Sequence, residues 1–192
     1  LLQVKIIQKI IGDEKRPWRR HNWEDLKHFL VHAKTGQIFF LPMKWVLLND
    51  RQSLIMKQKQ KKQKLYHKVQ PANITDCGDF YFKWEWVRDY TFPHNTPWKE
   101  VVDGKEIQHQ NLVIRPWEPG DMFVPLGMNG HKKISDFLID EKVDRFFKDN
   151  QFVLTANEEI VWVCGHRISN QVKVTSETTA LAKISIIRKN TK

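Results

Sequence analysis

The segment from residue 80 to residue 87 constrains the fold of this chain more than any other part of the sequence. Aromatic residues occupy every second position of it: Phe80, Phe82, Trp84 and Trp86. Successive side chains of a β-strand point to opposite faces, so these rings are predicted to share one face. Such a face usually fills a hydrophobic core, and we interpret Trp162 in the same way. A base-stacking surface is the alternative if the rings prove exposed.

Apolar spacing predicts the other elements. A helix is predicted over residues 1–11, ending at Gly12, and a second from an N-cap at Asn22 to Gly36. Two more short helices are predicted, one capped by Ser135 or Asp136 and ending at Ile139, and one over 142–148 that buries Val143, Phe146 and Phe147. Strands are predicted at 38–41, 43–48, 53–56, 112–115, 152–155, 160–164 and 178–187, with a turn at Asn49-Asp50. Residues 91–110, rich in Pro, His and Asn, are predicted to be loop.

These elements predict an α+β fold. Residues 1–36 form a helical hairpin, residues 37–111 form a β-rich region, and residues 112–192 form a compact α+β domain. The last of these has mixed or antiparallel strands and two short helices.

Charge is concentrated in one part of the chain. The net charge is +10, and residues 51–75 hold seven basic residues and no acidic one, leaving 25 basic and 22 acidic residues elsewhere. A local excess of this kind favours an anionic partner, although a like-charge run such as 57–68 also suits a solvated loop. No run of 18 apolar residues is present, so we expect no membrane partner.

The segment from Arg115 to Lys133 combines a terminal Arg with a Lys-Lys pair and several residues that shape a loop. The loop-shaping residues are Gly120, Asp121, Pro125, Gly127 and Gly130. Asp121 is predicted to cap the loop or to pair with Arg115. Arg and Lys supply hydrogen-bond donors and charge but few proton-transfer options near neutral pH, so the segment suits phosphate contact better than bond-breaking chemistry.

Catalytic and metal-binding patterns are weak. His28 and His32 are four residues apart, but no third ligand is evident, so no metal site is predicted. A Cys164–His166 nucleophile pair would need proximity of the two side chains in space and not only in sequence, so no such pair is predicted. Cys77 and Cys164 match no redox spacing and are interpreted as free thiols in a reducing compartment. No catalytic residue is predicted.

The run from Leu112 to Val174 resembles the C-terminal domain of the tRNA(Ile)-lysidine synthetase family. The resemblance rests on Arg115, Gly120-Asp121, Pro125, Gly127, Gly130, Lys132-Lys133, Asp136, Phe137 and Gly165-His166-Arg167. Residues 1–36, with Phe39, Pro42 and Asp50-Arg51, are similar to the helical middle domain of that family.

The resemblance implies a function. The family uses ATP, with a divalent metal, to adenylate the wobble cytidine of tRNA(Ile) with a CAU anticodon, and lysine then displaces AMP. Its N-terminal catalytic domain carries a Ser-Gly-Gly-x-Asp-Ser loop that this sequence lacks. We therefore expect a cytoplasmic fragment that needs no cofactor itself, is inert alone and holds tRNA at the acceptor stem. A homodimer is left open.

The residues expected to contact RNA are basic. Those near the loop and after it are Arg115, Lys132, Lys133, Arg145, Lys148, Arg167 and Lys173, and those in the lysine-rich run are Lys57, Lys59, Lys61, Lys62 and Lys64. The acidic residues Asp140, Glu141 and Asp144 are expected to face away from RNA.

Two alternatives stay open. One is a non-catalytic protein-interaction domain resembling the B-domains of phenylalanyl-tRNA synthetase β subunits. The other is a DNA-binding helix-turn-helix over 134–148, which its acidic residues disfavour in a major groove.

Overall fold

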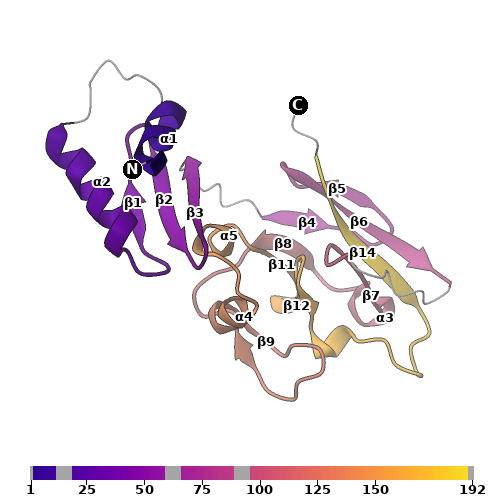
Figure 1. Cartoon of the computed structure of the whole chain (residues 1–192). Coiled ribbons are helices and arrows are strands. Elements are labelled where there is room, and N and C mark those ends of the chain that lie inside the picture. The colour runs from indigo at the N-terminus through magenta and orange to yellow at the C-terminus, as the bar shows by residue number, and fades with distance from the viewer. Residues whose placement is uncertain (1, 12–18, 59–65, 89–95, 190–192) are drawn as a thin grey trace. The chain divides into compact units, whose positions relative to one another are not determined.

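A computed structural model describes residues 2–11, 19–58, 66–88 and 96–189 (Figure 1). The chain forms two compact units. The first comprises Leu1–Gln63 with Asp144–Phe146, and the second comprises Lys64–Val143 with Phe147–Lys192.

The first unit packs two helices on a small antiparallel sheet. The helices are α1 (Leu2–Ile11) and α2 (Arg20–His32), and the sheet is β1 (Ile38–Phe40), β2 (Trp45–Asp50) and β3 (Ser53–Gln58) in that order. Its core joins Ile7, Leu26, Leu41 and Leu47. Two helices and three short strands are therefore present close to where they were predicted.

Details of this unit differ from prediction. The N-cap of α2 is Arg19 instead of Asn22, because the Asn22 N–H already donates to the Arg19 carbonyl within the first turn. The helix ends at His32, before Gly36. Asn49 and Asp50 belong to β2 and not to a turn, since Asp50 pairs with Ser53. Gly12 lies outside the described residues.

The second unit contains two antiparallel sheets that pack face to face. The five-stranded sheet has the order β13 (Arg167–Ile168), β12 (Glu159–Val163), β11 (Phe152–Ala156), β8 (Leu112–Pro116) and β4 (His67–Val69). The four-stranded sheet has the order β5 (Ile74–Asp76), β6 (Phe80–Val87), β14 (Leu181–Arg188) and β7 (Lys99–Asp103) (Figure 1). The core between them includes Phe82, Trp84 and Ile184 from one sheet and Ile114 and Trp162 from the other.

The aromatic strand has the predicted bounds and mostly the predicted burial. Phe82, Trp84 and Trp162 are buried, so they are core residues and offer no base-stacking surface. Trp86 is 42% exposed, and its assignment to the core is wrong. Its ring covers the edge of the core, edge-on to Trp84 at 5.6 Å and so close to Gly104 that a Cβ there would lie 2.3 Å from it.

The prediction that residues 91–110 are loop is wrong over residues 99–107. This part forms β7 and α3 (Gly104–Ile107), with the Asp103 side chain accepting from the Lys105 N–H as N-cap. The strand depends on pairing with β14 about 80 residues later in the chain, as in Asp103↔Leu181. The compact unit therefore starts well before residue 112, at Lys64.

A third layer covers the other face of the five-stranded sheet. It holds the hairpin of β9 (Met122–Phe123) and β10 (Lys132–Lys133) and the helix α4 (Ile134–Asp140). The short helix α5 (Arg145–Lys148) follows along the chain, and the 3-10 turn η1 (Asn170–Val172) contributes Val172 to the core between the two sheets. Phe123, Phe137 and Leu138 pack there against Val153 and Val163.

Both short helices differ from prediction. The N-cap of α4 is Lys133, so Ser135 and Asp136 lie inside the first turn and do not cap it. The second helix has only four residues, and each of them is half-buried or exposed. Phe147, which was predicted to be buried, is 57% exposed. A positive φ of 56° at Lys142 interrupts the helical path before it. The α+β class itself is confirmed.

Candidate nucleic-acid interface

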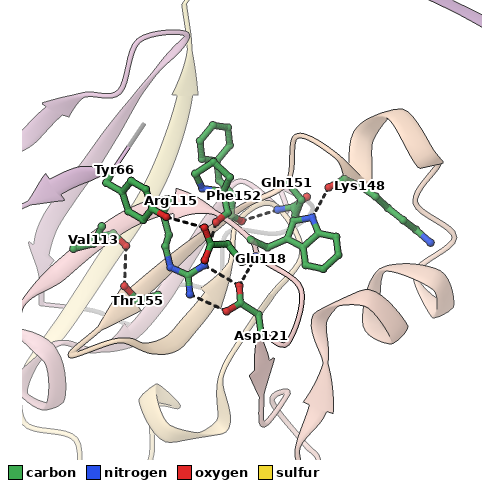
Figure 2. Close-up of polar contacts among 11 residues, drawn as sticks. Tyr66, Val113, Arg115, Glu118, Asp121, Lys148, Gln151, Phe152 and Thr155 are labelled. Carbon is green, nitrogen blue, oxygen red and sulfur yellow. Dashed lines mark hydrogen bonds and ion pairs between the residues drawn. The ribbon is translucent and has the colours of Figure 1, made fainter. Parts of the chain in front are cut away.

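Arg115 and Asp121 fix the start of the loop between β8 and β9. Arg115 Nη1 donates to Asp121 Oδ2 at 2.8 Å, and Nη2 donates to Oδ1 at 2.9 Å (Figure 2). Asp121 also accepts from the Glu118 N–H at 2.7 Å. The two side chains are only 15% and 14% exposed. The predicted pairing is present, and the hydrogen bonds to Asp121 raise the pKa of Arg115.

The same loop is anchored on both sides. The Tyr66 hydroxyl donates to Glu118 Oε1 at 2.8 Å, which raises the pKa of Tyr66. Trp117 Nε1 donates to the Lys148 carbonyl (Figure 2). The path from β8 to Asp121 is therefore held by its own Arg115–Asp121 pair, by the Tyr66 hydroxyl and by the Lys148 backbone carbonyl.

The glycines of the segment have unequal roles. Gly120 and Gly127 have φ values of 101° and 84°, in the left-handed region that favours glycine. Gly130 is not among the positive-φ residues, and a Cβ there would meet open space. Pro125 forms an isolated bridge with Ser169, which ties the loop to the end of the five-stranded sheet.

Three predicted RNA-contacting residues lie on β10 and β13, the strands beside α4, and we name Lys132, Lys133 and Arg167 the cation cluster. Lys132 and Lys133 form β10, and Lys132 Nζ lies 6.0 Å from the centre of the Phe137 ring. That ring is 6.2 Å from the ring of His166, the neighbour of Arg167. Burial lowers the pKa of His166. The rings therefore connect β10 to the start of β13.

Two acidic side chains form ion pairs with residues of the cation cluster. Asp140 Oδ2 lies 2.6 Å from Lys132 Nζ, and Glu141 Oε1 lies 3.6 Å from Arg167 Nη2. Asp140 and Glu141, which were expected to face away from RNA, thus contact two of the residues predicted to bind it. Tertiary packing around α4 therefore pairs each of these two carboxylates with a cation. Asp144 instead accepts from the Phe146 N–H.

The other predicted RNA-contacting residues belong to other segments of the chain. Lys173 is exposed after η1, and Lys57 is exposed at the end of β3 in the first unit. Arg145 Nη1 donates to the Gly36 carbonyl, also within the first unit. Lys148 is half-buried in α5. Lys59, Lys61, Lys62 and Lys64 lie outside the described residues.

Sequence reasoning missed a group beside Arg167. The Trp98 ring lies so close to Gly165 that a Cβ there would be 2.5 Å from it, and Gly165 has a φ of 77°. Arg188 lies over the same ring at 5.0 Å. Glu100 is close enough to Arg167 for its pKa to respond to that charge. The alternation of Trp98, Glu100 and Val102 is the signal that could have revealed this strand.

Burial of the Glu100 carboxyl predicts a pH-dependent stability. Burial raises its pKa from 4.5 to about 7, against the opposing effect of Arg167. Its stabilising contribution is therefore full below pH 4.5 and is lost as the pH rises through 7. Glu100→Gln is expected to stabilise the protein by about 1 kcal/mol at pH 8, a figure reduced for solvent screening, and to change little near pH 4.

Urea unfolding of Glu100→Gln at pH 4, 6 and 8 measures this effect. The control is Glu106→Gln, which removes an exposed carboxyl from α3. An equal gain for Glu100→Gln at pH 4 and pH 8 would exclude ionisation as the cause.

A cleft of about 260 Å³ lies between the β9–β10 hairpin and the β11–β12 turn. Its polar lining includes Asp121, His131, Glu158, Glu159 and Gln171. Glu159 Oε2 accepts from Gln171 Nε2. A lining rich in carboxylates repels phosphate, so this cleft is not the anion-binding surface.

Metal binding and cysteine reactivity depend on the clustering and the exposure of side chains in the part of the chain that the structure describes. That part contains no group of three His, Cys, Asp or Glu side chains arranged to hold a metal ion. Cys77 and Cys164 are buried and free, and burial raises both pKa values, that of Cys77 to about 11. Among the described helices, none is long and apolar enough to cross a membrane.

A comparison with protein families assigns the second half of the chain. The family model described as the TilS substrate C-terminal domain matches residues 112–186. These residues are thus similar to a TilS C-terminal domain. The match includes the Arg115–Asp121 pair, the cation cluster and α4, so the resemblance to the tRNA(Ile)-lysidine synthetase family is confirmed.

Relatives and a solved structure agree with the TilS assignment. The chain is 38% identical over 95 residues to the tRNA(Ile)-lysidine synthase of Geobacter sulfurreducens, covering 47% of this chain and 20% of that protein. It is 29% identical over 153 residues to that of Bacteroides thetaiotaomicron, covering 78% of this chain and 32% of that protein. A crystal structure of a TilS C-terminal domain superposes with a TM-score of 0.58 at 18% identity, over 67% of this chain and 100% of that one. The chain thus spans about a third or less of these curated relatives.

Proposed function

We propose that this chain is the tRNA-recognising part of an ATP-dependent ligase that joins lysine to the wobble cytidine of tRNA(Ile) with a CAU anticodon. The observation that carries the proposal is the cation cluster, which lies within the matched TilS domain. In this proposal the chain holds the acceptor stem and performs no chemistry itself.

The proposed recognition is electrostatic and depends on RNA shape. An A-form stem hides its base edges in a deep groove, so a protein contacts phosphates and 2′-hydroxyls. Lys132, Lys133 and Arg167 supply charged donors for phosphate oxygens. Arg115 has a different part: its bond to Asp121 fixes the loop that leads to β9, which pairs with the two lysines of β10.

ATP does not fit the described residues. A pyrophosphate site needs a glycine-rich turn whose backbone N–H groups open directly into a helix. The segment from Gly127 to Gly130 leads into β10 instead, and α4 begins only after it. In the proposal, ATP with its divalent metal, and lysine, therefore bind a catalytic domain of a whole cytoplasmic enzyme, and a homodimer is one assembly to test.

Fluorescence anisotropy of the intact chain tests the proposal. The ligands are a tRNA(Ile) transcript with a CAU anticodon, the same transcript with an altered acceptor stem, and a DNA duplex. The unaltered tRNA is expected to bind most tightly, with affinity falling by roughly 0.9 log unit per log[salt] for each phosphate contacted, on the duplex-DNA calibration.

Other outcomes favour other functions. Equal affinity for all three ligands would contradict specific tRNA recognition. Absence of RNA binding would favour the protein-interaction alternative, for which the exposed Ile74, Tyr81 and Ile187 of the four-stranded sheet offer a surface. The helix-turn-helix alternative has less support, because α4 has seven residues and α5 only four, too few to span a major groove.

A further inference from the structure

The end of α4 carries charges of the unfavourable sign. The helix has no basic residue in its last turn, and it ends with Asp140 followed by Glu141 as C-cap. The C-terminal end of a helix is electrostatically negative, so carboxylates there are repelled by the backbone dipole. Packing nevertheless places each carboxylate beside a cation: Asp140 beside Lys132 at 2.6 Å, and Glu141 beside Arg167 at 3.6 Å.

We infer that Asp140 and Glu141, here named the carboxylate pair, are built-in competitors of RNA phosphate for Lys132 and Arg167. The inference rests on the proposed tRNA-binding function and adds a regulation to it. In the free protein the carboxylate pair occupies the two cations. RNA binds by replacing each carboxylate with a phosphate oxygen, and the displaced carboxylates return to water.

Exposure makes this exchange feasible. The Asp140 side chain is 62% exposed and that of Glu141 is 37% exposed, so a displaced carboxylate is already largely hydrated. Exposed ion pairs contribute little to stability and are screened by salt. The Arg115–Asp121 pair is the opposite case, because both its side chains are about 15% exposed and its geometry is bidentate. Arg115 is therefore structural, whereas Lys132 and Arg167 are exchangeable.

Lys133 gives the cluster a point of first contact. It is exposed and follows Lys132 on β10, and the Lys132 side chain is 24% exposed. Successive side chains of a strand point to opposite faces, so that of Lys133 is directed away from the Lys132–Asp140 pair. An approaching phosphate can meet Lys133 before either neighbouring carboxylate is displaced. The exchange then needs no movement of the backbone, only rotation of surface side chains.

The experiment removes the carboxylate pair without changing the size of its side chains. Asp140→Asn/Glu141→Gln is expected to bind tRNA(Ile) about fivefold more tightly than the native chain, because two exposed pairs no longer compete. Binding is measured by anisotropy of the labelled transcript with the intact chain at fixed salt.

A matched control separates competition from net charge. Asp76→Asn/Glu85→Gln also removes two carboxylates, which pair with Lys189, Lys83 and Lys183 on the outer face of the four-stranded sheet. That face is on the opposite side of the unit, since α4 covers the far face of the five-stranded sheet. The control is expected to change affinity by less than about twofold.

A second experiment tests whether the gain in affinity depends on Lys132 and Arg167, the cations that the two carboxylates contact. In a Lys132→Gln/Arg167→Gln chain, the gain from Asp140→Asn/Glu141→Gln is expected to vanish, because the cations it releases are gone. An equal gain in the control variant, or a gain that persists in this background, overturns the inference while leaving tRNA binding intact. If the native chain does not bind tRNA(Ile) at all, the proposed function fails and the inference fails with it.

Discussion

Asp121→Ala is expected to lower the free energy of unfolding by about 3 kcal/mol, since removing one partner of a mostly buried ion pair leaves the other charge uncompensated. The guanidinium of Arg115 would lose both of its short hydrogen bonds, and the Glu118 N–H would lose its acceptor. A loss of this size is a large fraction of the stability of an ordinary domain. Urea unfolding followed by tryptophan fluorescence measures it.

Two further variants show whether the ion pair is the cause. Glu85→Gln breaks two exposed lysine contacts and is expected to cost less than about 1 kcal/mol. Arg115→Met/Asp121→Leu removes both charges and is expected to recover much of the loss, because no unpaired charge stays behind. A double variant as unstable as Asp121→Ala would show that loop geometry, and not the ion pair, sets the stability.

Elements with a strong local pattern were predictable from sequence. The alternating aromatic residues of β6 gave its bounds correctly. The gap between the predicted strands 152–155 and 160–164 coincides with a turn at Asn157 and Glu158, both with positive φ. Strand β7 was missed, because its stability comes from pairing with β14 far along the chain. Trp86 was misassigned for a related reason: the position of the core edge depends on Gly104, which sequence alternation alone does not place.

The site was predictable to a lesser extent. The sequence indicates that Lys132, Lys133 and Arg167 are basic residues in a matched motif, and the Arg115–Asp121 pair follows from a short loop between opposite charges. It does not indicate that Glu141 meets Arg167 across 26 positions, or that Trp98 covers Gly165. These contacts form only when α4 and the two sheets pack together, which brings residues that are distant in sequence side by side. Charge patterns therefore located the cations but not the carboxylates that compete for them.

Removing the cation cluster is expected to weaken tRNA binding by on the order of 100-fold, since each charged donor to phosphate contributes roughly 1 kcal/mol. The variant is Lys132→Gln/Lys133→Gln/Arg167→Gln, measured against the labelled tRNA(Ile) transcript over a range of salt. The salt dependence should also become shallower, by about one log unit per log[salt] for each lost phosphate contact. A merely structural role would change the affinity without this change of slope.

The matched control removes three positive charges elsewhere in the same unit. Lys83→Gln/Lys183→Gln/Lys189→Gln alters the outer face of the four-stranded sheet, where Glu85 and Asp76 already pair with these lysines. It is expected to weaken binding by less than about fivefold, through long-range charge alone. Equal losses in the two triple variants would show that net charge holds the RNA and that no localised interface exists beside α4. A large loss confined to the cation cluster, with an unchanged unfolding midpoint, would place the RNA on the face that carries β10 and the start of β13.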